Sequence, residues 1–283
     1  MRPWRGPLAA LVAVRVAIPL AVLAASGSKL PGLPRYEYGP LTGDGPGYYS
    51  SARELLSGWR GPAAAGLLLV PLGLLAALRL RRPRPVWAVL ALALSLSLAA
   101  AFSIHASGPS SAGAVGWPLL WSVPLAPLRA LGVAGQDGAF AVGLALSLAC
   151  NAVTVVATGY AGLAATGRRS VGLGAAALFA LWPLLAGAIA GTRGWENGTW
   201  EVDAGLHMYT EPLSTALVAV GAALLLGRLT PLRLAGAGLA LGYAFAVRPT
   251  NGLFAALAVL LGLWRERRAA LPLLAGALAV API

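Results

Sequence analysis

Charged side chains are scarce in this sequence: they make up 11% of its 283 residues, and nine residues are acidic. A water-soluble domain of this length needs far more polar surface, so the scarcity excludes that class. In their place 58% of the residues are hydrophobic, and apolar runs near twenty residues recur along the chain. Such runs match the roughly 20 residues with which a helix crosses a bilayer. The composition predicts an all-α, polytopic membrane protein.

Cysteine and histidine are almost absent. The one cysteine, Cys150, lies inside an apolar run and excludes a disulfide within the chain. The best candidates for metal ligands are Glu201, Asp203 and His207. Two carboxylates and a distant histidine are a weak metal signal, so we interpret them as part of a solvated loop. No cofactor is predicted, and whether a divalent metal is used stays open.

The net charge of +12 comes almost entirely from arginine. These arginines form short clusters between the apolar runs and do not line one face of a helix. Their placement argues against a nucleic-acid partner and favours a lipid bilayer.

Apolar runs predict about nine spans. The first follows Met1-Arg-Pro-Trp-Arg5, as a signal peptide would, but it is long and lacks a small-x-small cleavage site. We therefore expect it to be retained as the first helix. The predicted spans are 7–26, 61–80, 86–106, 138–163, 171–191, 209–227, 233–247, 252–264 and 269–283.

The distribution of basic residues predicts the orientation. With the N-terminus in the cytoplasm, thirteen of the 21 basic residues fall in short inner loops or at inner helix ends. The acidic residues fall outside, apart from Glu266. The inner basic residues are Arg2, Arg5, Arg79, Arg81, Arg82, Arg84, Arg168, Arg169, Arg228, Arg233, Arg265, Arg267 and Arg268. We expect a plasma-membrane protein whose active face is outside.

Long polar segments occur only on this outer side, at 27–60, 107–137 and 192–208. Chemistry in a membrane protein needs polar groups that lie outside the lipid. The sequence thus predicts one transmembrane domain over 1–283, with its functional residues gathered in the outer segments.

The first outer segment is rich in glycine and proline up to Gly47, and then changes character. Tyr48, Ala52, Leu55 and Trp59 recur at helical spacing, which predicts a short amphipathic helix at the outer membrane surface. Asp44 precedes it. Two interpretations of Asp44 are open: a helix cap or Asx turn, or a functional carboxylate.

The second outer segment contains Pro118, Pro124 and Pro127. Three prolines argue against a straight span and favour a re-entrant or surface-lying piece. We interpret Trp117 and Trp121 as interfacial aromatic residues in preference to ligand contacts.

Two charged residues flank prolines near the later spans. Glu211 precedes Pro212 at the start of an apolar helix, where a carboxylate complements the helix N-terminus. It is a helix-start group, a functional group or both. Arg248 precedes Pro249 at the outer face, against the positive-inside trend. Its fork could bind a phosphate, or it could snorkel to lipid head groups.

Taken in order, these motifs resemble the GT-C superfamily of membrane glycosyltransferases, which includes protein O-mannosyltransferases and aminoarabinose transferases. The resemblance covers residues 7 to 268. It is carried by Asp44 with Tyr48-Tyr49 and Ala52-Arg-Glu-Leu-Leu-Ser-Gly58, by Trp117-Pro-Leu-Leu and Pro124-Leu-Ala-Pro127, by Leu181-Trp-Pro183, by Tyr209-Thr-Glu-Pro-Leu213 and by Val247-Arg-Pro249.

The resemblance implies inverting transfer of a sugar from a polyprenyl-phosphate donor to an acceptor hydroxyl outside the cell. In that reaction Asp44 would be the base, and Arg248, or else Arg193, would stabilise the leaving phosphate. Tyr48 and Tyr49 would hold the sugar or the base, Glu211 would orient the acceptor or Arg248, and His207 would contribute to substrate binding.

The sequence departs from the family in two places. Its first loop has one aspartate where many members carry an acidic pair, and it ends at Ile283 where members usually continue. The resemblance thus implies that the family's C-terminal part is missing. Two rival functions stay open: a transporter or flippase, for which Arg15 is one of few polar groups at depth, and a non-catalytic subunit of an envelope-synthesis complex.

Overall fold

The computed structural model describes residues 4–25, 50–54, 85–107, 116–132, 136–190, 210–265, 267–281 and 283. Within these ranges every regular element is helical, which confirms the predicted all-α class. The helices are α1 (Arg5–Ala25), α4 (Pro85–Ser107), α5 (Gly116–Ala130), α6 (Gln136–Thr166), α7 (Arg169–Ala190), α10 (Glu211–Leu226), α11 (Pro231–Val247), the 3-10 helix η2 (Pro249–Asn251), α12 (Gly252–Arg265) and α13 (Arg267–Ala279).

Eight of the nine predicted spans coincide with a helix, and the remaining one, 61–80, lies outside the described residues. Among the described residues, one helix is both long and apolar enough to cross a membrane: the Ala141–Thr166 part of α6. The number of spans therefore stays a prediction.

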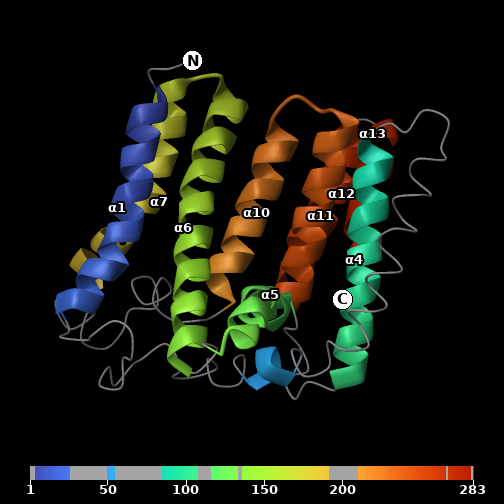
Figure 1. Cartoon of the computed structure of the whole chain (residues 1–283). Helices are drawn as coiled ribbons and strands as arrows, with labels where there is room; N and C mark the ends of the chain where they lie inside the picture. The colour runs from blue at the N-terminus through green and yellow to red at the C-terminus, as the bar shows by residue number, and fades with distance from the viewer. Residues whose placement is uncertain are drawn as a thin grey trace.

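The long helices stand side by side, and α6 with α7 and α10 with α11 form antiparallel pairs (Figure 1). Neighbours in the bundle include α1 with α6 and α7, α6 with α10, α10 with α11, and α11 with α13. The α6–α7 and α10–α11 turns lie at one end of the bundle. The start of α10, the end of α11 and the short helix α5 lie at the other (Figure 1). We call this second end the α5 end.

Glycines allow α11 and α13 to approach closely. A Cβ atom on Gly238 would collide with the carbonyl oxygen of Leu273, and one on Gly276 with that of Ala235. Small residues at such positions let helix backbones pack together, as is common between helices in membranes.

Polarity is distributed unusually between the interior and the surface. Many buried side chains are polar, and several hydroxyls donate to the preceding turn, as Thr154 Oγ1 does to the carbonyl oxygen of Cys150 at 2.8 Å. Large apolar side chains are exposed on the outer faces of most helices. Examples of exposed residues are Val14, Leu96, Val153, Leu178, Trp182, Phe245, Leu260 and Leu271.

Candidate functional site

Segments from distant parts of the sequence meet in one hydrophobic cluster at the α5 end. Ala52 comes from the short turn 50–54, Trp121 and Leu125 come from α5, and Leu213 and Val247 come from α10 and α11. The cluster also contains Leu144, Cys150 and Ala216. The turn 50–54, helix α5 and the residues next to Glu211 and Arg248 therefore meet at the α5 end.

The turn 50–54 is the described part of the helix predicted after Gly47. Ala52 is fully buried and Arg53 is exposed, as the predicted helix face requires. Ser50 Oγ donates to Glu54 Oε1 at 3.3 Å, one helical turn further on. The apolar side of this turn packs against protein.

The proline-rich segment forms helix α5, which is 15 residues long and lies at the end of the bundle (Figure 1). At 1.5 Å per residue it extends about 22 Å, too short to cross a bilayer. Pro118 stands in its first turn, where no backbone N–H partner is lost. Trp121, predicted at the membrane interface, is instead fully buried in the protein with Leu125 one turn later. The sequence held a signal for this burial, since positions 118, 121 and 125 have the spacing of one helix face.

A hydrogen bond fixes the start of α5 to α11. The hydroxyl of Tyr243 donates to the carbonyl oxygen of Gly116 at 2.6 Å. Gly116 also lies so close to α11 that an added Cβ would be 2.9 Å from both the backbone nitrogen and Cγ2 of Val247. This position requires glycine for the two helices to touch.

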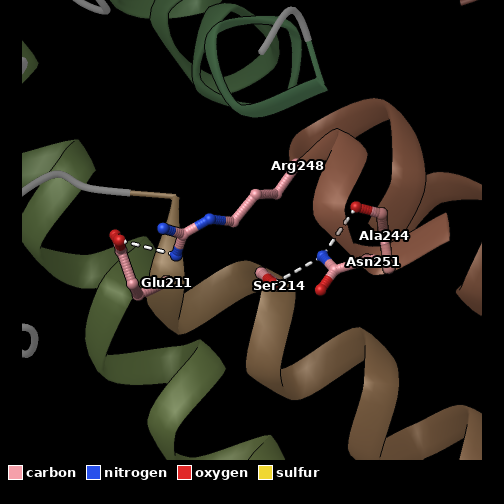
Figure 2. A network of polar contacts seen from close by, with 5 residues as sticks. All are labelled: Glu211, Ser214, Ala244, Arg248 and Asn251. Atoms are coloured by element: carbon pink, nitrogen blue, oxygen red, sulfur yellow. Dashed lines mark hydrogen bonds and ion pairs between the residues drawn. The ribbon is translucent and has the colours of Figure 1, made fainter. Parts of the chain in front are cut away.

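Arg248 lies where α11 ends. Its backbone is extended, with φ −151° and ψ 109°, because a residue before proline avoids the helical conformation. The chain therefore turns, and the side chain reaches α10 (Figure 2). Nη1 of Arg248 lies 2.7 Å from Oε1 of Glu211, the first residue of α10. The side chains are 45% and 27% exposed, so the pair is open to solvent.

A second contact lies one turn deeper between the same segments. Asn251 Nδ2 donates to Ser214 Oγ at 2.7 Å and to the carbonyl oxygen of Ala244 at 2.9 Å (Figure 2). Both Asn251 and Ser214 are buried. The turn that carries Arg248 is thereby fixed to α10 by a polar anchor that does not itself face solvent.

The structure thus brings Glu211 and Arg248 together, as one of the predicted roles of Glu211 requires. The other predicted site residues, Asp44, Tyr48, Tyr49, Arg193 and His207, lie outside the described residues. Across the described ranges, no three or more His, Cys, Asp or Glu side chains gather closely enough to hold a metal ion.

Arg248 retains donors for a ligand. Its guanidinium has five N–H groups, and Glu211 is its only side-chain partner within the described part of the chain. An arginine with one side on a carboxylate and the others in solvent is suited to an anionic group such as phosphate.

Sequence reasoning missed the residues that support this pair. Asn251, Ser214 and Tyr243 were not singled out, although Asn251 stands three residues after Arg248, just as Ser214 stands three after Glu211. In α10 this spacing places Glu211 and Ser214 on one face of a helical turn. Arg248 has an extended backbone, so the sequence held no such signal for Asn251.

Comparisons of the chain with protein-family models, with curated proteins and with solved structures give no match. The function must be inferred from the residues themselves.

Proposed function

We propose that the protein is an integral membrane glycosyltransferase that moves a sugar from a polyprenyl-phosphate donor to an acceptor hydroxyl, with inversion, at the outer surface of a plasma membrane. One observation supports the proposal: the turn 50–54, which follows Asp44 in the sequence, lies at the same end of the bundle as α5, Glu211 and Arg248.

The surface of the bundle supports a multi-pass membrane location. Soluble monomers rarely expose large contiguous apolar patches, whereas here big aliphatic side chains are exposed on helix after helix, for example Leu96, Leu260 and Leu271. Serine, threonine and asparagine side chains lie inside instead. A bundle with this distribution is suited to a hydrocarbon solvent.

Arg248 is proposed to bind the donor phosphate. In the transfer step the acceptor oxygen forms a bond to the anomeric carbon, and the bond from that carbon to the phosphate oxygen breaks. The lipid phosphate leaves with the electron pair, so negative charge develops on it. A guanidinium placed beside that charge stabilises the transition state, and Glu211 fixes the guanidinium in position.

Asp44 is proposed to take the proton of the acceptor hydroxyl. A hydroxyl is a weak nucleophile, and a carboxylate within hydrogen-bond reach assists it by about 10²–10⁴-fold in typical enzymes. Asp44 stands six residues before Ser50 in the sequence, and the turn that begins at Ser50 contributes Ala52 to the cluster at the α5 end.

The experiment is sugar transfer in membranes that contain the full chain, with a panel of radiolabelled polyprenyl-phosphate hexoses and pentoses. Loss of the labelled lipid must match the gain of a labelled acceptor. Arg248→Gln is expected to lose transfer, and Arg233→Gln, at the opposite end of the same helix, is the matched control. Equal transfer by both variants, or no transfer by the wild-type chain from any donor, would contradict the proposal.

A transporter is the second candidate, favoured by one observation: Arg15 is buried at the middle of α1. Transporters place charged groups at such depth. Uptake of solute into proteoliposomes without formation of a glycosidic product would favour this function.

A further inference from the structure

Arg15 is held inside the bundle by neutral groups. Its side chain is 5% exposed, and Nε and Nη2 donate to Oδ1 of Asn151 at 3.1 and 2.8 Å. Its Cζ lies 4.8 Å from the ring centre of Phe179. Asn151 is itself fixed, since its Nδ2 donates to the carbonyl oxygen of Ser147 at 3.1 Å.

This charge lacks a counter-ion. Nη1 of Arg15 is buried and has no hydrogen-bond partner, and no carboxylate pairs with the side chain, among the residues that the structure describes. An arginine cannot escape the cost of burial by releasing its proton. Buried charges in proteins are therefore paired, and an amide oxygen and an aromatic ring compensate only in part. The buried guanidinium of Arg15 is therefore expected to bind an anion.

Arg15 and Asn151 line a cleft of about 410 Å³ between α1, α6, α7 and α10. Its walls are mainly apolar and include Leu178, Phe179 and Trp182. Leu178 and Trp182 are also 58% and 42% exposed on the outside of α7, so the cleft opens onto the apolar surface of the bundle.

Glu211 lines the same cleft at the start of α10. Its carboxylate is already paired with Arg248. The described cleft therefore has one unmatched charge, and it is positive. A small, fully hydrated anion would gain nothing from the apolar walls, whereas a lipid would fill them with its chains.

We propose that this cleft binds an anionic lipid through its phosphate, with Arg15 as the cationic partner and the exposed side of α7 as the wall for the lipid chain. The inference rests on the membrane location proposed above, but not on the transfer reaction.

The test uses the full chain, purified in a neutral detergent and freed of lipid. Native mass spectrometry then measures the binding of phosphatidylglycerol, a polyprenyl phosphate and phosphatidylcholine, and inorganic phosphate serves as a competitor. We expect one tightly bound anionic lipid per chain, a clear preference over phosphatidylcholine, and no displacement by inorganic phosphate. The two anionic probes identify the source of the phosphate, and tight binding of either supports the proposal.

Two variants connect the binding to Arg15. Arg15→Gln removes the charge and is expected to weaken anionic-lipid binding by about tenfold or more, as loss of a charge-assisted hydrogen bond does. Arg5→Gln, which changes an exposed arginine on the same helix, is the matched control and is expected to bind as the wild type does.

Asn151→Asp covers the case in which Arg15→Gln fails to fold. The carboxylate loses the hydrogen bond that the Asn151 amide donates to Ser147, but it keeps both acceptor contacts to Arg15 and supplies the missing negative charge within the chain. This variant is expected to fold and to lose its preference for anionic lipid. Wild-type binding by Asn151→Asp would overturn the proposal. So would equal binding by Arg15→Gln and Arg5→Gln, or full displacement of the lipid by inorganic phosphate. Because binding is measured without donor sugar, its failure is separate from any failure of transfer.

Discussion

The side chain of Asn251 joins two helices at the α5 end: its amide donates to Ser214 on α10 and to the carbonyl oxygen of Ala244 on α11. It stands three residues after Arg248 and therefore fixes the turn from which that arginine reaches Glu211. The buried amide of Asn251 therefore both stabilises the packing of α10 against α11 and positions Arg248.

Removal of the Asn251 amide is expected to destabilise the bundle. Asn251→Leu leaves the Ser214 hydroxyl without this donor in a buried place, which typically costs about 1–3 kcal/mol. Thermal unfolding in detergent measures the effect. Ser214→Ala removes one of the two contacts and should cost less. An Asn251→Leu protein as stable as the wild type would show that the anchor contributes nothing.

The Glu211–Arg248 pair is expected to matter for activity more than for stability. Exposed ion pairs contribute about 0–1 kcal/mol, so Glu211→Gln should leave the unfolding temperature almost unchanged. The same variant releases the guanidinium, and transfer should fall about tenfold or more. Measurement of both properties on one preparation separates the roles. A large loss of stability with unchanged specific activity would make the pair structural.

The contact between α5 and α11 is so close that adding a single methyl group at Gly116 is expected to destabilise the protein. Gly116→Ala places a Cβ 2.9 Å from the backbone of Val247, and overpacking of this kind costs about 1–3 kcal/mol. Gly174→Ala is the matched control, since a Cβ at this position in α7 meets no atom within 4 Å. It should be neutral or stabilising, because alanine favours a helix. The unfolding temperatures should therefore move in opposite directions.

The proposed orientation is testable because the chain has one cysteine. After Cys150→Ala, single cysteines are introduced at two exposed positions, Leu131 in the turn that follows α5 and Arg168 just after the end of α6. A membrane-impermeant maleimide added to intact cells should label Leu131→Cys. Arg168→Cys should react only after the cells are opened. The reverse pattern would invert the orientation, and labelling of both from outside would exclude a spanning α6.

Helix positions could be predicted from the sequence because they depend on local composition. Apolar runs bounded by arginine clusters and prolines define α7, α10 and α11 within a few residues. Arg248 illustrates the reason. The proline after it favours an extended backbone, so the end of α11 can be predicted from two adjacent residues. Contacts between helices join residues that are far apart in the sequence, so composition alone does not predict them.

Trp121 and Asn251 show what composition cannot reveal. A tryptophan near a predicted interface is expected to face lipid head groups, yet Trp121 is buried because α5 packs its 118–121–125 face inward. Asn251 cannot be identified from the sequence, because its role depends on a hydrogen bond to Ser214, which stands 37 positions earlier. Glu211 and Arg248 were both predicted as candidates from their charge, but their ion pair requires α10 and α11 to be antiparallel neighbours.

The most direct test of Asp44 as the base of a glycosyltransferase is the rate of sugar transfer by Asp44→Asn in membranes, measured beside the wild type with whichever polyprenyl-phosphate sugar the wild type consumes. The substitution keeps the size of the side chain and removes its capacity as a base. We predict a loss of about 10²-fold or more at an unchanged amount of folded protein. Transfer by Asp44→Asn at the wild-type rate would contradict this prediction.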